Sequence, residues 1–307
     1  MSTLCALILT YNESKHLHRC IESLKSVANE IVVVDSFSTD DTAAIATSIG
    51  ARLYEHVFIN YSAQVNWALN AIAIQSEWIL RIDADEYLTP ELASELARAI
   101  STASPSITGL IYRRGVTFLG QRVRFGGAGG QWVLRCWRTG HARCESRWMD
   151  EHMILESGQA QRLRHLVIDD NLNDISWWTR KHIGYAAREA VDLLNLRHRF
   201  LVIPNEHKQG VGNAAATKRW IKEKCYSRLP QGVRPALYYL YRMLFQLGIL
   251  EGPKGWAFHF LQGLWYRTLV DIKIWEVETA MRDQGLEVND AILTVLDIDI
   301  SRFKPAE

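Results

Sequence analysis

Four short apolar runs in the first 90 residues alternate with segments of helical periodicity, and this alternation limits the fold more than any other feature. The runs are LCALILT, EIVVVDS, ARLYEHV and EWILRID, at residues 4–10, 30–36, 51–57 and 77–83. The segments between them carry apolar residues at helical spacing. Strands that alternate with such helices predict a right-handed, parallel α/β sheet with helices on both faces.

Polar clusters follow three of these runs. They are Thr10-Tyr11-Asn12-Glu13, Asp35-Ser36 and Asp83-Ala84-Asp85. The carboxyl ends of parallel strands share one edge of a sheet, and ligands bind there, so we expect these clusters to converge. The alternative for DADEYLTPEL is an acidic helix start, with Thr89 as N-cap and Pro90 in the first turn. That alternative accounts for the residues from Thr89 onward but leaves both aspartates unexplained. Two closely spaced carboxylates suit Mg²⁺ or Mn²⁺ bound together with phosphate oxygens.

Composition and missing motifs exclude several classes of protein. A hydrophobic content of 48% allows a sizeable core, and a net charge of +1 predicts no nucleic-acid partner. The turn TYNES after the first run lacks glycine, which argues against a dinucleotide fold, and no P-loop occurs. Five cysteines without paired spacing indicate free thiols in a reducing cytoplasm. We expect neither a signal peptide nor a membrane-spanning helix.

Four segments in a fixed order resemble the family 2 glycosyltransferases of the GT-A fold. They are ALILTYNESKHLHRCIESL, EIVVVDSFSTDDT, YSAQVNWAL and WILRIDADEYLTPEL, and the resemblance covers roughly residues 3–200. Within the family, the chain is most similar to bacterial lipopolysaccharide-core and exopolysaccharide transferases. The resemblance implies a GT-A, mostly parallel sheet in a catalytic domain over residues 1–205. It also implies inverting transfer from a nucleotide-diphosphate sugar, most often a UDP-sugar, with Mg²⁺ or Mn²⁺ as cofactor.

The resemblance also assigns roles to residues of the donor site. Asp35 is expected to contact the base, Asp83 to lie near the ribose and Asp85 to hold the metal. The remaining residues expected at the nucleotide sugar are Thr10, Tyr11, Asn12, Glu13, Gln64, Asn66 and Ala84. Many relatives carry Lys or Arg at the position of Val65. In this chain, the positive charge that such a residue brings to the pocket must be supplied by another residue.

An inverting transfer also needs a base for the acceptor hydroxyl. We align Glu151, in SRWMDEHMIL, with the acidic residue that relatives place near this point, and Asp150 stays open as a rival; a polar loop is the structural alternative. Between the metal motif and this base, the glycines of residues 126–130 predict a mobile loop. Trp132 and Trp137 are candidates for sugar stacking or core packing. Arg135 and Arg138 are candidates for acceptor or phosphate contacts, because residues 113–147 hold eight arginines and one acid.

The C-terminal part, residues 206–307, differs in composition. Residues 220–276 hold 12 of the 31 aromatic residues, with eight Lys or Arg against four acids. This pattern predicts two helices broken at residues 251–253, which either attach to an anionic membrane surface or pack on protein, including a homodimer partner. A lipid-linked or polysaccharide acceptor would fit a peripheral enzyme on the inner face of the cytoplasmic membrane.

Two other functions stay open. One is a phosphohydrolase of the haloacid dehalogenase type, with Asp83 as nucleophile and Asp169-Asp170 as its later acidic pair. The other is a non-catalytic, membrane-bound scaffold that keeps a vestigial nucleotide pocket. Release of free phosphate without an acceptor would favour the hydrolase, and undetectable nucleotide-sugar binding would favour the scaffold.

Overall fold

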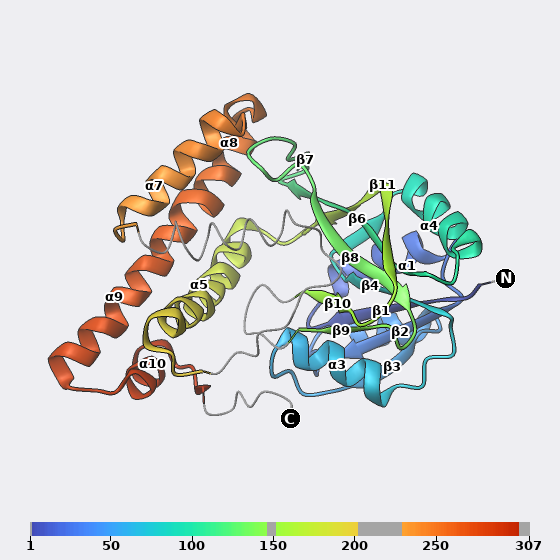
Figure 1. Ribbon diagram of the computed structural model, residues 1–307, viewed down its shortest axis with the longest axis horizontal. Coiled ribbons are helices and arrows are strands. Elements are labelled where there is room, and N and C mark those ends of the chain that lie inside the picture. The colour runs from blue at the N-terminus through green and yellow to red at the C-terminus, as the bar shows by residue number, and fades with distance from the viewer. Residues whose placement is uncertain (1, 146–151, 202–228, 301–307) are drawn as a thin grey trace.

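The computed structural model describes residues 2–145, 152–201 and 229–300, and it joins an α/β part to a group of long helices (Figure 1). The α/β part lies on the right of the figure and the helical group on the left. The helices of that group are α5 (Ile175–His198), α7 (Val233–Leu240), α8 (Pro253–His259), α9 (Tyr266–Gln284) and α10 (Val288–Leu296).

Four parallel strands make one half of the main sheet. They are β1 (Leu4–Thr10), β2 (Glu30–Asp35), β3 (Arg52–Glu55) and β4 (Trp78–Asp83), in the order β3-β2-β1-β4. Their register sets Thr10 opposite Asp35 and Leu9 opposite Asp83. The three polar clusters therefore end at one edge, as the sequence predicts.

The other half of the sheet is mixed. It contains β5 (Glu86–Leu88), β6 (Ile107–Phe118), β7 (Gln121–Arg122), β8 (Gln131–Arg138) and β11 (Gln159–Asp170). Strand β8 runs antiparallel between β4 and β6, while β11 pairs in parallel with β6 and antiparallel with β5. The predicted α/β fold class with a C-terminal helical extension is confirmed, and the parallel pairing dominates in the N-terminal half.

Shorter helices cover both faces of the sheet. They are α1 (Ser14–Leu24), α2 (Thr42–Ser48), α3 (Tyr61–Ala71) and α4 (Pro90–Thr102). Helices α1 and α4 pack on one face, and α3 packs on the other with the small sheet of β9 (Ala142–Cys144) and β10 (Met153–Leu155). Helix α4 begins as predicted: the Thr89 side chain accepts a hydrogen bond from Leu92 N at 3.2 Å, and Pro90 occupies the first turn.

The helical group has a hydrophobic core of its own. Its members come from α5, α9 and α10, and they include Ala190, Leu194, Ile274 and Val277. Helix α5 therefore packs mainly with the C-terminal helices. The packing changes from one core to the other between Asp170 and Ile175, earlier than the predicted boundary at residue 205.

The segment of residues 246–251, between α7 and α8, contacts the loop that contains the glycines of residues 126–130. The helical structure is interrupted between the short helix η3 (Gly248–Glu251) and α8, where the sequence predicts an interruption. The Glu251 carboxylate accepts backbone N–H bonds from Arg124 at 2.9 Å and Phe125 at 2.6 Å, and Gly126 N donates to Gln246 O at 2.8 Å.

The glycine-rich loop, which the sequence predicts to be mobile, is held against the helical group by these hydrogen bonds. Gly126 has a φ of +62°, and a Cβ there would lie 2.2 Å from the His259 ring. The glycine permits a close approach between the loop and the helices, and the loop is fixed by that approach. In the described residues no helix is long and apolar enough to cross a membrane.

Candidate functional site

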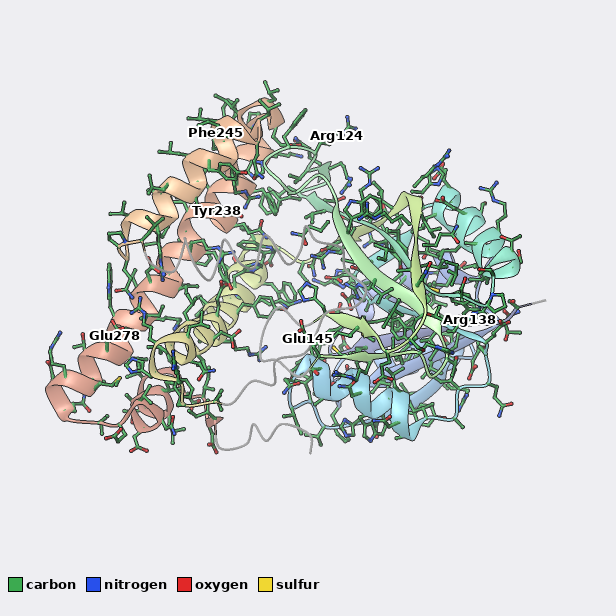
Figure 2. The ribbon with its side chains drawn as sticks, in the orientation of Figure 1. Arg124, Arg138, Glu145, Tyr238, Phe245 and Glu278 are labelled. Carbon is green, nitrogen blue, oxygen red and sulfur yellow. The ribbon has the colours of Figure 1, made fainter. Side chains whose placement is uncertain are left out.

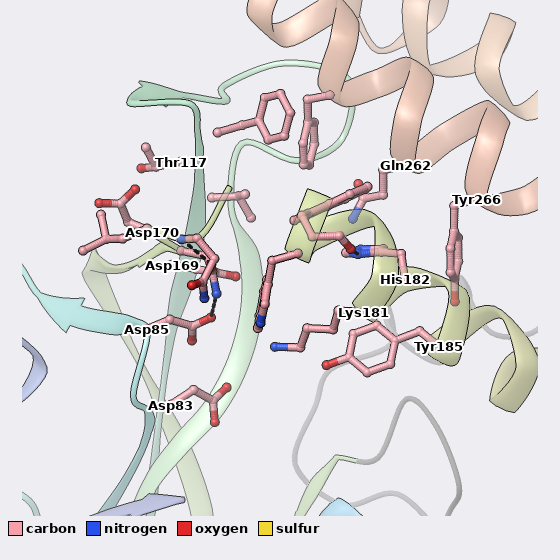
Figure 3. A pocket seen from close by; sticks show the side chains of 18 of the residues that line it. Asp83, Asp85, Thr117, Asp169, Asp170, Lys181, His182, Tyr185, Gln262 and Tyr266 are labelled. Carbon is pink, nitrogen blue, oxygen red and sulfur yellow. Dashed lines mark hydrogen bonds between the residues drawn. The ribbon is translucent and has the colours of Figure 1, made fainter. Parts of the chain in front are cut away.

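A cavity of about 1340 Å³ separates the carboxyl ends of the strands from the helical group (Figure 3). One wall consists of the sheet edge, and the opposite wall consists mainly of α5 with parts of α7 and α9. The sheet side contributes residues 9–13, 83–85 and 169–173. The helical side contributes Trp178, Lys181, His182, Tyr185, Tyr238 and Tyr266, among others.

The loop after β1 is held by the neighbouring loop after β2. Asn12 N donates to Ser38 Oγ at 2.8 Å, and Thr39 N donates to Asn12 Oδ1 at 2.8 Å. These bonds support the left-handed backbone of Asn12, whose φ is 55°. The predicted residues Thr10, Tyr11, Asn12 and Glu13 all line the cavity.

Asp35, for which a contact with the base stays a prediction, forms hydrogen bonds within the protein. Its side chain is buried, and it accepts hydrogen bonds from Thr10 Oγ1 at 2.7 Å, Ser38 N at 2.7 Å and Ser38 Oγ at 2.6 Å. Asp35 is not among the residues that line the cavity, whereas Ser36 is. In this structure Asp35 orders the two loops that border the cavity.

Asp83 lies at the floor of the cavity and is surrounded by cations. Its carboxylate accepts from the Tyr61 hydroxyl, from Arg81 Nη2 at 3.4 Å and from Arg135 Nη2 at 2.9 Å. Burial acts to raise the pKa of Asp83, but Arg135 and Arg81 outweigh burial and hold that pKa well below its ordinary value. Asp83 is therefore ionised at neutral pH, and its hydrogen bonds hold the carboxylate in place.

Asp85 has a more open environment. Its Oδ2 accepts one hydrogen bond, from Asn171 Nδ2 at 3.0 Å, and within the described residues no Lys, Arg or His nitrogen lies within 4.0 Å of its carboxylate. No group of three metal-ligating side chains occurs in the described part of the chain. A carboxylate at a cavity wall that has no cationic partner among the described residues fits Mg²⁺ or Mn²⁺, which complete their shells with substrate phosphate and water oxygens.

Asp169 and Asp170 lie beside Asp85, because β11 returns to the same edge of the sheet. Asp170 N donates to Asp85 O at 3.0 Å, and the Asp170 carboxylate pairs with Arg19 at 2.6 Å. Burial, followed by the charge of Asp85, raises the pKa of Asp169 to about 7. In the sequence this pair appears only in the hydrolase alternative, since nothing local indicates that β11 lies near the metal motif.

The helical wall is made of residues that the sequence does not single out. His182 stacks on Trp178 with ring centroids 3.4 Å apart, and burial, with a smaller effect of Lys181, lowers the pKa of His182 to about 4. His182 is therefore a neutral ring at neutral pH. Figure 3 shows the Lys181 side chain extending from α5 toward the aspartate wall.

The two polar residues of α3 have different positions. Gln64 lines the cavity, where its amide donates to Ser36 Oγ at 3.2 Å. Asn66 instead exchanges two hydrogen bonds of 2.9 Å with the backbone of Cys144, and it does not line the cavity. Asn66 thus attaches α3 to β9, and its contact with the nucleotide sugar stays a prediction. Val65 is fully buried in the core, so it brings no charge to the cavity.

The predicted acceptor-side residues of β8 do not line the cavity. Arg135 is buried and binds Asp83 and Glu86, because β8 pairs with β4, the strand that ends at Asp83. Arg138 pairs with Glu77 and lies opposite Trp78, at the beginning of β4 and far from the helical group (Figure 2). These positions give no support to the predicted phosphate contacts of the two arginines, which stay predictions.

The two tryptophans of β8 do not line the cavity: one lies in the core and the other contacts arginines on the surface. Trp137 is fully buried in the core beneath α3. Trp132 is 39% exposed and contacts Arg113 and Arg162, whose guanidinium carbons lie 5.7 Å and 5.1 Å from its ring centroid. Trp132 does not line the cavity, so its predicted sugar contact is not supported.

Both candidates for the base, Asp150 and Glu151, lie outside the described residues. The residues that flank them are described: Glu145 N donates to His152 O at 3.0 Å, and His152 Nδ1 lies 3.0 Å from Glu145 Oε1. The assignment of the base stays a prediction.

Comparison with known families decides the broad class. Residues 5–149 match the model named glycosyl transferase family 2. This part of the chain belongs to glycosyl transferase family 2. The family 2 segment includes the loop after β1, the Asp83–Asp85 motif and strand β8, and its boundary falls just before the predicted base.

Several curated proteins are similar to this chain. An uncharacterized glycosyltransferase of Rickettsia felis is 42% identical over 96 residues, which are 31% of this chain and 33% of the relative. The SPbeta prophage-derived glycosyltransferase SunS of Bacillus subtilis is 39% identical over 101 residues, 31% of this chain and 23% of the relative. A TPR repeat-containing protein of Synechococcus elongatus is 26% identical over 284 residues, 83% of this chain and 63% of the relative. The matched part thus spans about a third of the first relative.

Among solved structures, glucosyl-3-phosphoglycerate synthase from Mycobacterium tuberculosis, in complex with Mn²⁺, UDP and glucosyl-3-phosphoglycerate, is similar to the chain. The TM-score is 0.32 at 22% identity, and the match covers 38% of this chain and 44% of that chain.

The family 2 match also disfavours the phosphohydrolase alternative. That alternative needs Asp83 as a free nucleophile, whereas both of its carboxylate oxygens accept hydrogen bonds from charged or phenolic donors. A carboxylate held in this way is a weak nucleophile, because its charge and most of its lone pairs are already engaged.

Proposed function

We propose that the protein is an inverting, metal-dependent glycosyltransferase that moves a hexose from a nucleotide-diphosphate sugar, preferably a UDP-sugar, to a lipid-linked or polysaccharide acceptor. The observation that carries this proposal is the family 2 match over residues 5–149, because the matched segment supplies the open carboxylate Asp85 at the edge of a large cavity. The location of a donor beyond the carboxyl ends of the strands agrees with the general rule for α/β sheets.

On the donor side, residues 10–13 and Gln64 would border the nucleotide, and Asp83 would accept from the ribose hydroxyls. Asp85 would hold Mg²⁺ or Mn²⁺, which would supply positive charge to the diphosphate. Arg81 and Arg135 keep Asp83 ionised, so its free lone pairs remain acceptors at neutral pH. These residues bind and orient the donor and do not take part in proton transfer.

On the acceptor side, Glu151 or Asp150 would take the proton of the acceptor hydroxyl. The acceptor oxygen then forms a bond to the anomeric carbon, while the bond from that carbon to the diphosphate oxygen breaks and its electron pair leaves with the diphosphate. Because attack comes from the face opposite the leaving group, the configuration at the anomeric carbon is inverted. Asp85 would lie on the side of the leaving group, which makes it unsuitable as the base.

The lipid-linked class of acceptor is supported by an exposed apolar surface on the helical group. Phe245 is 79% exposed at the outer edge of this group (Figure 2). Other exposed residues of this surface are Leu237, Leu240, Tyr241, Leu244, Leu247, Ile249, Leu250, Trp256 and Phe260. An apolar patch of this extent is typical of membrane or protein contact sites. We propose that it attaches the protein to the inner face of the cytoplasmic membrane, where lipid-linked acceptors are available, and that dimerisation is the competing use.

Sedimentation with anionic liposomes distinguishes these two uses. The wild-type protein should co-sediment at low salt and less at high salt, and Phe245→Ser with Leu250→Ser should reduce co-sedimentation at both. The matched control is Leu293→Ser, an exposed leucine on α10. Absence of co-sedimentation together with a stable dimer in solution would refute membrane attachment.

A thermal-shift screen with UDP, GDP and dTDP, each with Mn²⁺, Mg²⁺ or EDTA, tests the proposed donor class. A nucleotide that binds the native state raises the melting temperature by an amount that follows RT ln(1 + [L]/Kd). UDP with metal should stabilise the wild type, and Asp85→Asn should lose this metal-dependent part. If no nucleotide stabilises the wild type, the proposal fails and the scaffold alternative is favoured. Phosphate release without an acceptor would favour the hydrolase.

A further inference from the structure

The two walls of the cavity have opposite charge. The sheet wall carries several carboxylates, namely Glu13, Asp83, Asp85, Asp169 and Asp170. The helical wall carries Lys181 on α5, whose ammonium group is directed toward the side of Asp85 in Figure 3. A phosphate group that entered the cavity would be repelled by the sheet wall unless cations faced it.

Arg180 and Arg188 also line the cavity without a carboxylate oxygen within 4.0 Å among the described residues, and Arg242 donates to Gly126 O. Three further cations at or beside the cavity lie near carboxylates. Arg19 pairs with Asp170 at 2.6 Å, Arg267 pairs with Glu189 at 2.6 Å, and Arg114 lies 3.9 Å from Asp169. For Lys181, by contrast, the described residues offer no carboxylate oxygen within 4.0 Å of its ammonium nitrogen. Lys181 is therefore a half-buried positive charge without an ion-pair partner in this part of the chain.

Aromatic rings hold Lys181 in position. Its Nζ lies 4.6 Å from the centroid of the Trp177 ring and 5.8 Å from that of Tyr185. The aromatic faces are attractive to an ammonium group, so they limit the freedom of the flexible stem before any ligand binds. Burial acts to lower the pKa of Lys181, but Tyr185, Asp85 and Glu13 outweigh it and raise that pKa, so the group is charged at neutral pH.

We propose that Lys181 is a phosphate-binding residue of the donor site and contacts the diphosphate of the nucleotide sugar from the side opposite Asp85. The inference rests on the proposed glycosyltransferase function. The diphosphate would lie between the metal at Asp85 and the Lys181 ammonium. The ammonium would compensate negative charge of the diphosphate, which the carboxylates of the sheet wall cannot do. Because the negative charge on the diphosphate grows as the sugar departs, Lys181 also stabilises the leaving group. Helix α5 thereby contributes a residue from outside the matched segment 5–149.

The experiment compares Lys181→Met and Lys181→Arg with Lys273→Met as matched control. Lys273 lies on α9 and does not line the cavity. Binding of UDP and of uridine to each protein is measured by calorimetry with Mn²⁺ and without acceptor. Lys181→Met should weaken UDP binding by about 10- to 100-fold, the usual range for one charge-assisted hydrogen bond, and leave uridine binding unchanged. Lys181→Arg should restore part of the UDP affinity, and Lys273→Met should match the wild type.

The outcomes separate this inference from the proposed function. If the wild type binds no nucleotide, the proposed function fails and this inference with it. If the wild type binds UDP and Lys181→Met binds it equally well, the inference alone is refuted, and a raised KM for acceptor would then assign Lys181 to an acceptor phosphate. Equal losses for UDP and uridine would indicate a structural role for Lys181 and would also refute the inference.

Discussion

Arg135→Met should destabilise the protein strongly, although the residue does not contact the cavity. Its guanidinium lies 2.9 Å from Asp83 and 3.3 Å from Glu86, and the Glu86 side chain is only 1% exposed. Removing one partner of a buried ion pair costs about 3–5 kcal/mol, because it leaves a buried charge uncompensated. Since Arg81 still lies 3.4 Å from Asp83 and Arg114 lies 3.8 Å from Glu86, we expect the lower end, about 3 kcal/mol.

The cost of Arg135→Met should depend on pH with a defined sign. Burial raises the pKa of Glu86 while Arg135 opposes that rise, and Arg135 holds the pKa of Asp83 well below its ordinary value. Without Arg135 both folded-state pKa values increase, so the folded state of the variant binds protons more readily than the folded state of the wild type. Stability relative to the wild type then falls as the pH rises from about 5 to 8. The deficit should be large at pH 8 and smaller at pH 5.

Thermal melting of Arg135→Met, of the wild type and of a matched control at pH 5 and pH 8 checks this prediction. The control is Arg113→Met, an exposed arginine on β6 that contacts Trp132. At pH 8 we expect the melting temperature of Arg135→Met to fall by about 5–10 °C, and that of the control by no more than about 2 °C. A deficit that is equal at both pH values, or larger at pH 5, would refute the reasoning that Arg135 serves to neutralise two buried carboxylates.

Three further predictions follow. Glu151→Gln should lower the transfer rate by about 10² or more with UDP binding nearly unchanged, whereas an inactive Asp150→Asn beside an active Glu151→Gln would assign the base to Asp150. Because the pKa of Asp169 is raised to about 7, its ionisation costs stability as the pH rises above about 4. Asp169→Asn in EDTA should therefore be more stable than the wild type by up to about 4 kcal/mol at pH 8, since each of about three pKa units contributes about 1.4 kcal/mol, and equal to it near pH 4, as measured by denaturant unfolding. Glu251→Gln should lose charge-assisted bonds to Arg124 N and Phe125 N, and hydrogen exchange in residues 119–130 should increase.

The sequence alone was sufficient for the parallel half of the sheet and for one edge of the cavity. Apolar runs and helical periodicity are local properties, and the convergence of residues 10–13 with Asp83 and Asp85 follows from the rule that parallel strands share a carboxyl edge. The start of α4 at Thr89 and Pro90 was equally local, since an N-cap bond spans three residues.

The fate of the arginines in β8 required the tertiary structure. Composition indicates that residues 113–147 are basic, but only the antiparallel pairing of β8 with β4 decides that Arg138 lies opposite Trp78 and away from the cavity. The same pairing buries Arg135 beside two carboxylates. Glycine content indicates conformational freedom, and only the tertiary structure shows the close approach of His259 to Gly126, which restricts that freedom.

The second wall of the cavity was also beyond the sequence. Lys181 and His182 lie on a helix whose residues resemble many other helical surfaces, and Asp169 ends a strand with no motif of its own. They reach the site because α5 packs with α9 and α10 while β11 inserts between β6 and β5. The local sequence therefore determined the sheet edge that carries Asp85. Long-range packing determined which side chains face that edge, because contacts across the cavity depend on strand register and helix packing, which neighbouring residues do not encode.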